Sequence, residues 1–293
     1  MRNRLLYLMT LVICVSLFAS CKDDDEVMNT KIFNLNISGL ENLGAGYAYE
    51  GWLIVDGNPI SSGVFTVNNS GSLSKTSFEV DKSDLETATT FVLTLEPSPD
   101  NDPAPSKVHI LAGDFTGTNA SLAISHGAAL NSTFLNIAGK YILATPTDGM
   151  GNNENSGIWF LDLVSGNPAT GLTLPALPEG WAYEGWAVIN GIPVSTGVFT
   201  SASGADQAAS YSGTMSVPPF PGEDFLTNAP GGLVFPTDIS GGIAVISIEP
   251  VPDNSANPFL LKPLLVNIPA NALDHTPYPM NQNLVFPMGS VTR

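Results

Sequence analysis

The chain has 293 residues, with 10 Lys and Arg against 27 Asp and Glu and a formal net charge of −17. Binding to nucleic acid or to an anionic membrane surface depends on clustered Lys and Arg, so this charge balance disfavours both. Only 13% of the residues are charged, and the length is sufficient for two apolar cores.

The N-terminal segment 1–20 is predicted to be a signal peptide. Two arginines give it a positive start, and the apolar stretch 5–18 is shorter than the about 20 residues of a membrane-spanning helix. Small residues directly before Cys21 resemble a bacterial lipobox, with Phe18 departing from the usual Leu, Val or Ile. This resemblance implies that Cys21 carries the lipid (palmitate) and begins the mature protein.

An acidic run follows at residues 22–26. It resembles the run after the lipidated cysteine of Bacteroidota lipoproteins that directs them to the outer face of the outer membrane, although a solvated linker has the same composition. We therefore expect a lipidated acidic tether at 21–30 and a cell-surface location on the outer membrane. Cys14 leaves with the signal and Cys21 is acylated, so no thiol remains for a disulfide or a metal.

The most informative feature is an internal repeat. Residues 46–67 read GYAYEGWLIVDGNPISSGVFTV, and residues 180–201 read GWAYEGWAVINGIPVSTGVFTS, 134 residues later. A second match occurs at an offset of 153, so the second copy has 19 additional residues between the matching blocks. They fall around the Pro- and Gly-rich stretch 218–232, an expected surface loop because loops lengthen at little thermodynamic cost. The pattern predicts a duplicated domain.

Short apolar runs broken by turn residues predict strands in chain order at 31–38, 52–55, 63–65, 90–95, 108–111, 140–145, 157–163, 186–189, 197–199, 243–248 and 264–268. Single helical turns are expected at 81–86 and 120–126. We therefore predict an all-β fold of two tandem immunoglobulin-like β-sandwich domains after a lipoprotein signal peptide. The first sandwich repeat is expected at 31–138 and the second at 139–293.

Each copy contains a predicted hairpin. The dipeptides Asp56-Gly57 and Asn190-Gly191 suit two-residue type I′ turns, whose twist matches the flanking strands. A proline follows each turn, at Pro59 and Pro193, and fits only an edge strand or a bulge.

The repeated residues resemble the extracytoplasmic C-terminal domain of anti-sigma-K factors. The shared pattern is Tyr-Glu-Gly-Trp, a turn, a Pro-x-Ser-x-Gly-x-Phe run, and a β-run that ends in Glu-Pro. In this chain these are Tyr49, Glu50, Trp52, Pro59, Ser61, Gly63, Phe65, Glu96 and Pro97, and again Tyr183, Glu184, Trp186, Pro193, Ser195, Gly197, Phe199, Glu249 and Pro250. The resemblance implies a β-sandwich-like fold and a non-catalytic, signal-sensing role.

The chain also departs from that family. Its anti-sigma factors bind a sigma factor through a cytoplasmic N-terminal domain and cross the membrane by one helix, and this sequence shows neither feature. We expect that the protein is not itself a sigma-factor binder, and that the extracytoplasmic module is used twice on a lipid anchor.

The candidate binding residues are Glu50 and Trp52, with Glu184 and Trp186 in the second copy. A carboxylate beside an indole can hold a sugar by hydrogen bonding and ring stacking. The structural interpretation is a core Trp beside a Glu that accepts hydrogen bonds from backbone amides, and we favour it because aromatic side chains dominate β cores.

No catalytic set, metal site or cofactor is predicted. A glycosidase pair of Glu50 and Glu96 needs a separation that sequence does not supply. The polar stretch 147–155 lacks the spacing of an EF-hand loop, and the three histidines lie far apart. No nucleophile elbow or phosphate-binding loop occurs.

The favoured hypothesis is a membrane-anchored extracytoplasmic lipoprotein whose two domains form a non-catalytic binding or sensing module for an envelope protein. Stretches 218–232 and 148–156 are the expected contact sites. The alternatives are a surface glycan-binding or glycan-processing lipoprotein that uses the paired Glu and Trp residues, and a purely structural envelope protein.

Overall fold

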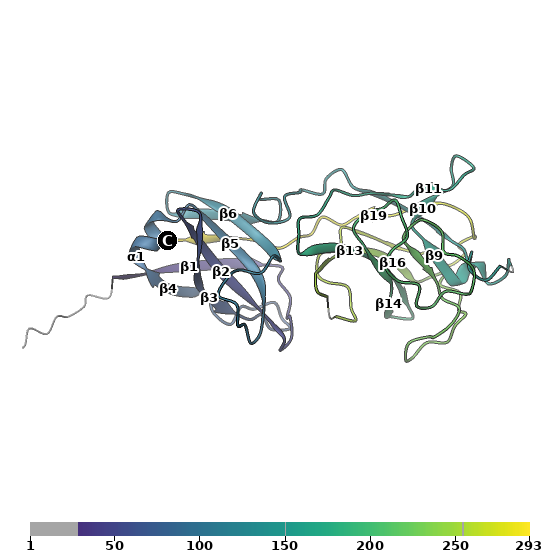
Figure 1. Ribbon diagram of the computed structural model, residues 1–293, viewed down its shortest axis with the longest axis horizontal. Helices are drawn as coiled ribbons and strands as arrows, with labels where there is room; N and C mark the ends of the chain where they lie inside the picture. Colours follow the sequence, from purple (N-terminus) through teal and green to yellow (C-terminus); the bar gives the residue numbers. More distant parts are fainter. Residues whose placement is uncertain (1–28, 150, 254) are drawn as a thin grey trace, which may run out of the picture.

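The computed structural model describes residues 29–149, 151–253 and 255–293, so the predicted signal peptide and Cys21 lie outside the described residues. Within them there is one short α-helix, α1 (Lys82–Thr87), and one 3₁₀ turn, η1 (Glu154–Ser156). The all-β prediction is confirmed, with several sheets in a sandwich-like arrangement. Two modules lie end to end along the long axis (Figure 1). We call residues 29–137 with 286–293 the first module, and residues 138–285 the second module.

The first module is one eight-stranded antiparallel sheet in the order β3-β2-β5-β6-β7-β20-β1-β4. Its strands are β1 (Thr30–Ser38), β2 (Tyr47–Val55), β3 (Asn58–Phe65), β4 (Ser77–Asp81), β5 (Thr90–Pro97), β6 (His109–Thr116), β7 (Asn119–Ala123) and β20 (Met288–Thr292).

This sheet folds over on itself, because rings from strands that are distant in the sheet order meet in its core. Phe33 of β1 meets Phe91 of β5 edge-on with ring centroids 6.0 Å apart, and Phe65 of β3 meets Phe78 of β4 edge-on at 6.1 Å. All four rings are buried. The two halves of the sheet therefore act as the two layers of a sandwich.

The two predicted helical turns have different outcomes. The turn expected at 81–86 is present as α1, where the Asp81 side chain accepts from the backbone N–H of Ser83 at 2.7 Å and caps the helix. The turn expected at 120–126 is wrong, because β7 occupies Asn119–Ala123. Ala120 and Leu122 alternate inward with exposed neighbours, the period of a strand.

The second module contains two larger sheets. One has the order β14-β13-β16-β17-β19 and the other β12-β8-β9-β15, with β18 paired to β8 and a separate β10-β11 ribbon. The strands are β8 (Ala138–Leu143), β9 (Gly157–Trp159), β10 (Leu161–Asp162), β11 (Ala169–Thr170), β12 (Leu172–Thr173), β13 (Trp181–Ile189), β14 (Ile192–Phe199), β15 (Gly222–Asp224), β16 (Ile243–Pro250), β17 (Leu264–Asn267), β18 (Tyr278–Pro279) and β19 (Asn281–Gln282). The predicted hairpin of 140–145 with 157–163 is present as β8 and β9.

The two matching sequence blocks form the same local structure. In each, the hairpin strand bearing Tyr-Glu-Gly-Trp lies between the returning strand and the Glu-Pro strand: β3-β2-β5 and β14-β13-β16. Both turns have two successive residues with positive φ, Asp56 and Gly57 at 49° and 80° and Asn190 and Gly191 at 52° and 83°, as type I′ requires. The returning strands β3 and β14 are both edge strands with a bulge.

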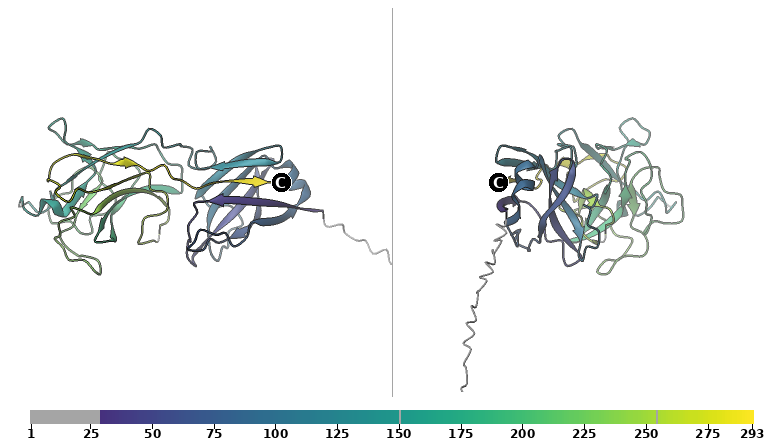
Figure 2. Two further views of the ribbon diagram at one scale, coloured as in Figure 1. Left: turned by 180° about the vertical axis from the view of Figure 1, so that it is seen from behind. Right: turned by 60° about the vertical axis from the view of Figure 1, so that its left-hand side comes forward.

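The C-terminal strand β20 does not lie with the second repeat, where the segment 139–293 placed it. It pairs with β1 on one side and with β7 on the other, inside the first sheet (Figure 2). Without it, β1 and β7 would both present unpaired edges. Val291 of β20 is fully buried in the core, so the strand also contributes apolar packing. The second module is therefore an insertion in the first, joined to it at both ends.

The modules also share one continuous apolar core, which includes Trp181 and Phe259 from the second module and Leu95 and Val108 from the first. Gly180, just before β13, has a φ of +90°, and a Cβ there would lie 2.4 Å from the backbone oxygen of Lys107. The second module thus approaches the first at a point where only glycine fits. Of the helices in the described ranges, none is long and apolar enough to cross a membrane.

We predict that β20 is required for the first module to fold. Val291→Asn places an unpaired amide in the core and is expected to lower the free energy of unfolding by about 3 kcal/mol or more. The matched change Thr292→Asn, on the exposed face of the same strand, is expected to cost less than about 0.5 kcal/mol. Thermal unfolding and hydrogen exchange of β1 and β7 measure both. Equal protection of β1 and β7 in the two variants would contradict the role of β20.

We also predict that Gly180 sets the approach of the two modules. Gly180→Ala combines a left-handed backbone with a clash against Lys107, and is expected to destabilise the protein by about 2 kcal/mol or more. Gly46, the equivalent residue of the first copy, has open space around its Cβ position, so Gly46→Ala is the control and is expected to change stability by less than about 0.5 kcal/mol. Chemical denaturation of both variants tests the difference.

Candidate functional site

Both Tyr-Glu-x-Trp motifs turn the tyrosine inward. Tyr49 and Tyr183 are buried and stack on Phe65 and Phe199, with ring centroids 5.5 and 5.8 Å apart. Each hydroxyl donates to a backbone oxygen eight residues earlier, that of Glu41 at 3.0 Å and that of Pro175 at 2.7 Å. The tyrosines therefore hold the chain that leads into each strand, which is a structural role.

The two tryptophans lie on the opposite face and are also buried. Trp52 is 3% exposed and Trp186 is 2% exposed. Their indole N–H groups donate to the hydroxyls of Thr94 at 2.9 Å and Ser247 at 2.8 Å on the neighbouring strand. Neither indole presents a face on which a sugar ring can stack, and both polar atoms are satisfied within the sheet.

The glutamates of the motif lie beside these tryptophans, with the Glu-Pro glutamates on the next strand. Glu50 accepts from the Ser61 hydroxyl and Glu184 from the Ser195 hydroxyl. Glu249 accepts from the backbone N–H of Phe259 at 2.9 and 3.2 Å. In the first module Glu96 accepts from the backbone N–H of Ser106 at 2.9 and 3.1 Å in the same way. Each Glu-Pro glutamate thus closes the loop that follows its strand.

In the second module the carboxyl groups of β13 and β16 converge with a third. Carboxylate oxygens of Glu184, Glu249 and Asp253 all lie within 4.8 Å of one another. Glu184 and Glu249 are 5% and 1% exposed, and Asp253 is half-buried. We call these three residues the carboxylate cluster. Within the described ranges, no other group of three acidic, His or Cys side chains is this close.

Burial controls the protonation of this cluster. The pKa of Glu249 is raised to about 8, mainly by burial and in part by the negative charges of Asp253 and Glu184, against the hydrogen bonds from Ser247 and Phe259. Burial also raises the pKa of Glu184 to about 7, opposed by the Ser195 hydrogen bond and supported by Asp253. Removing carboxylates from water disfavours their charged form, so the cluster needs either protons or a counter-charge at neutral pH.

The other sequence candidates do not join this cluster. In the stretch 147–155, Glu154 accepts from the backbone N–H of Thr145 at 2.9 Å. The three histidines are apart: His109 contacts the backbone oxygen of Ala128, while His126 and His275 each contact one aspartate. Within the described ranges these contacts form no set of metal ligands.

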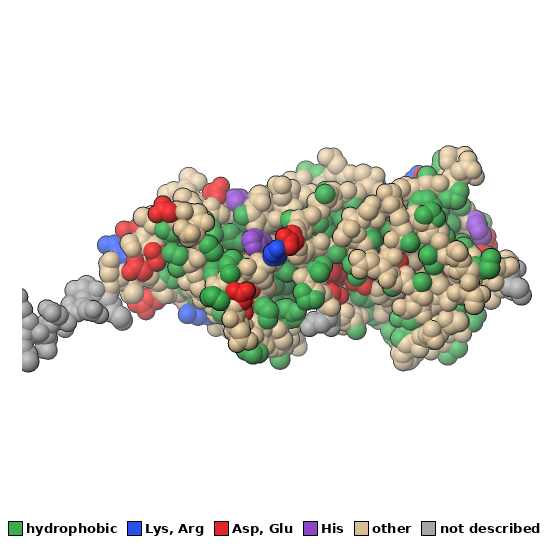
Figure 3. Space-filling view, viewed as in Figure 1, with side chains coloured by type: hydrophobic (Ala, Val, Ile, Leu, Met, Phe, Trp, Pro, Cys, Tyr) green, Lys and Arg blue, Asp and Glu red, His purple; other side chains and the backbone are tan. Residues whose placement is uncertain are grey.

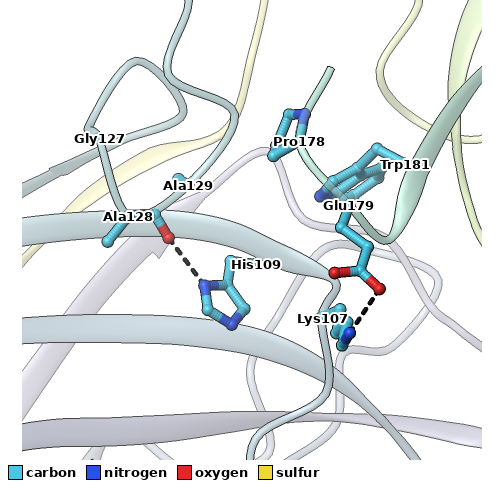
Figure 4. A pocket seen from close by; sticks show the side chains of 8 residues that line it. All are labelled: Lys107, His109, Gly127, Ala128, Ala129, Pro178, Glu179 and Trp181. Atoms are coloured by element: carbon cyan, nitrogen blue, oxygen red, sulfur yellow. Dashed lines mark hydrogen bonds and ion pairs between the residues drawn. The ribbon is translucent and has the colours of Figure 1, made fainter.

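Two surface cavities lie elsewhere. One, of about 350 Å³, lies at the junction of the modules between Lys107 and His109 of the first and Pro178, Glu179 and Trp181 of the second (Figure 4). The side chains of Lys107 and Glu179 form an ion pair across it. The other, of about 380 Å³, is almost wholly apolar and belongs to the second module.

We call the second cavity the apolar pocket. Trp159 lies at its wall, with an indole N–H that donates to Asp224 at 2.7 Å. Pro218, Pro219 and Phe220 come from the predicted surface stretch 218–232, and Phe220 packs on the apolar cluster around Trp159. Sequence reasoning identified this stretch by its Pro and Gly content but missed Trp159, whose part in the pocket follows only from tertiary folding.

Asp206, also in the second module, is expected to make the stability of the fold depend on pH. Burial raises the pKa of its carboxyl to about 7, opposed by backbone N–H donors of Gly222 and Ala208 and supported by the nearby charges of Glu223 and Glu184. Folded protein then holds a proton that unfolded protein releases, so stability is full below the ordinary Asp range and falls as pH rises to about 7.

We predict that Asp206→Asn removes part of this decline. Between about pH 5 and pH 8, the unmodified protein is expected to lose about 1–2 kcal/mol more stability than the variant. Asp56→Asn is the control, because Asp56 is exposed and the second copy has Asn190 at the same turn position. Urea unfolding at both pH values measures the effect. Identical pH slopes for the protein and Asp206→Asn would contradict it.

No curated protein and no solved structure matches this chain. A protein-family model described as "Anti-sigma-K factor rskA, C-terminal" matches residues 29–109, which span β1 to β5 and the first residue of β6. The first module is thus similar, over residues 29–109, to the C-terminal domain of anti-sigma-K factors.

Proposed function

We propose that this protein is a membrane-anchored extracytoplasmic lipoprotein that works as a non-catalytic binding or sensing module. The observation that carries the proposal is the family match over residues 29–109 in a chain with lipoprotein-type sequence features at Cys21. Sigma-factor binding is not part of the proposal, because the matched region is the C-terminal domain alone.

The orientation of the modules supports presentation of a surface away from the membrane. β1 begins next to α1, where the backbone N–H of Lys82 donates to Asn29 at 2.7 Å. α1 lies at the end of the first module remote from the second (Figure 1). A lipid on Cys21 therefore anchors the first module and places the second module outward. The face seen in Figure 3 carries few charged side chains over the second module.

The apolar pocket is the proposed contact site on that outward module. Its lining is nearly all apolar and includes four proline rings, together with the rings of Trp159 and Phe220; the prolines are Pro146, Pro168, Pro218 and Pro219. Such flat, rigid walls suit an extended, proline-containing segment of an envelope protein, because proline-rich strands dock in aromatic-lined grooves. The pocket lies on the stretch 218–232 that sequence analysis singled out.

The absence of catalysis is part of the proposal. The contacts of the three histidines, in the ranges that the structure describes, are with the backbone of Ala128 and with Asp114 and Asp274 rather than with a hydroxyl nucleophile. Serines of the repeated strands donate to buried glutamates instead. These contacts support binding over acyl transfer or hydrolysis.

A photo-crosslinking amino acid at Phe220 tests this proposal on intact cells. We expect it to capture one dominant envelope protein, while the same amino acid at Ser72, an exposed loop residue of the first module, captures none. Deleting 218–232 is a poorer test, because it removes β15 and the buried Asp224. Capture of the same proteins from both positions, or of none from Phe220, would contradict the proposed contact site.

A further inference from the structure

The carboxylate cluster has the geometry of a cation site. Oxygen ligands bind Ca²⁺ at about 2.3–2.6 Å, so two ligands on opposite sides of the ion are roughly 4.6–5.2 Å apart. Oxygens of Glu184, Glu249 and Asp253 lie within 4.8 Å of one another, which fits three ligands around one ion. Glu184 and Glu249 come from neighbouring strands and Asp253 from the loop after β16, so strand pairing fixes two of the ligands.

One atom of the cluster lacks a partner. Oε1 of Glu184 accepts from Ser195, whereas its Oε2 is buried and has no hydrogen-bond partner. Leaving a buried carboxylate oxygen unpaired costs free energy, because the group has lost water and gained nothing in exchange. A cation between Glu184, Glu249 and Asp253 supplies that missing interaction. We propose that Glu184, Glu249 and Asp253 bind a divalent cation, and that the cation is Ca²⁺.

The chemical type of the three ligands indicates which metal ion the site prefers. All three ligands are carboxylates, and no His or Cys belongs to the group. Hard cations such as Ca²⁺ prefer oxygen ligands, while Zn²⁺ in proteins favours Cys and His. Mg²⁺ demands near-ideal octahedral geometry and keeps several waters, so a buried site of three protein carboxylates suits Ca²⁺ better.

The site has access to solvent and a negative surrounding charge. Asp253 lines a small cavity of about 100 Å³ together with Glu41, Pro250 and Phe259. The positive charge of Lys262 interacts with the carboxyl groups of Glu249 and Glu41. When they are ionised, the three cluster carboxylates outnumber the positive charge of Lys262, so the site attracts a cation, and the cavity leaves room for water ligands beside Asp253.

The first module supplies an internal control. Glu50, Glu96 and Asp100 stand at the matching sequence positions, and Glu50 and Asp100 both act electrostatically on Glu96. They do not converge as closely, however, since only the second-module set meets the 4.8 Å condition within the described ranges. Asp100 is also exposed, whereas Asp253 is half-buried. The same three residue types therefore form a cation site in one module and a loop-closing hydrogen-bond set in the other.

Titration of the full-length, chelator-treated protein with CaCl₂ in a calorimeter tests the proposal. We expect one equivalent of Ca²⁺ to bind with a dissociation constant on the order of 10⁻⁴ M and at least about tenfold preference over Mg²⁺. Ca²⁺ is also expected to raise the melting temperature. Glu184→Gln is expected to weaken Ca²⁺ binding at least about tenfold and to abolish the thermal shift.

Two further variants make the result decisive. Glu50→Gln, the matching change in the first module, is expected to leave Ca²⁺ affinity unchanged. If Glu184→Gln fails to fold, Asp253→Asn replaces it, because the Asn amide oxygen can still accept from Ser255, as Asp253 does at 2.8 Å. The proposal is overturned if the unmodified protein binds no Ca²⁺ at millimolar concentration, or if Glu50→Gln weakens binding as much as Glu184→Gln. A carboxylate cluster that holds only protons gives the first of these results.

Discussion

The pairing of β20 with β1 and β7 is the interaction on which the rest of the architecture depends. It brings the last strand of the chain back between strands whose residues lie more than 150 positions earlier. The strand that completes the first sheet follows the whole second module in the chain. The first module therefore cannot be completed independently of the second. Two covalent connections and the continuous core then hold the joint, and the close contact of Gly180 with Lys107 follows from this constraint.

Because the joint is fixed, the same three-stranded unit has two different environments. In the first module, Trp52 packs in a small apolar cluster with Ala128 and Ala129. In the second, carboxylates gather in and around the core: besides the cluster, Glu223 and Asp224 are fully buried and accept hydrogen bonds from neighbouring residues. The additional residues of the second copy supply Glu223 and Asp224, so the insertion adds buried carboxyl groups as well as surface.

Local features of the fold are predictable from the sequence. Asp56-Gly57 and Asn190-Gly191 determine their hairpins through φ preferences that involve only two residues, and Pro59 and Pro193 identify edge strands because proline lacks a donor. The inward and outward faces of Tyr49 and Trp52 follow from the period of a strand. These predictions succeed because the physics that decides them acts within a few residues.

Long-range features are not predictable in this way. Met288–Thr292 has the composition of any short strand, and nothing in it specifies a partner in the first module rather than the second. Glu184 and Glu249 are 65 residues apart, and their approach depends on the pairing of Ala182 with Glu249 and of Glu184 with Ser247. The repeat points to these residues, because both glutamates recur in both copies. The sequence does not show, however, that the carboxyl groups come together in the second module and not in the first.

The carboxylate cluster lies close to the joint between the two modules. Asp253 lines the same small cavity as Glu41, and Glu41 lies just after β1 and holds Tyr49 through its backbone oxygen. The Lys262 ammonium group interacts electrostatically with the carboxyl groups of both Glu41 and Glu249. The cluster therefore lies against the joint of the modules, where a change in its charge acts on groups from both. The proposed ion would neutralise repulsion inside the second module and leave Lys262 to Glu41 across the joint, so it would act on the contact between the modules as well as on the stability of the second module.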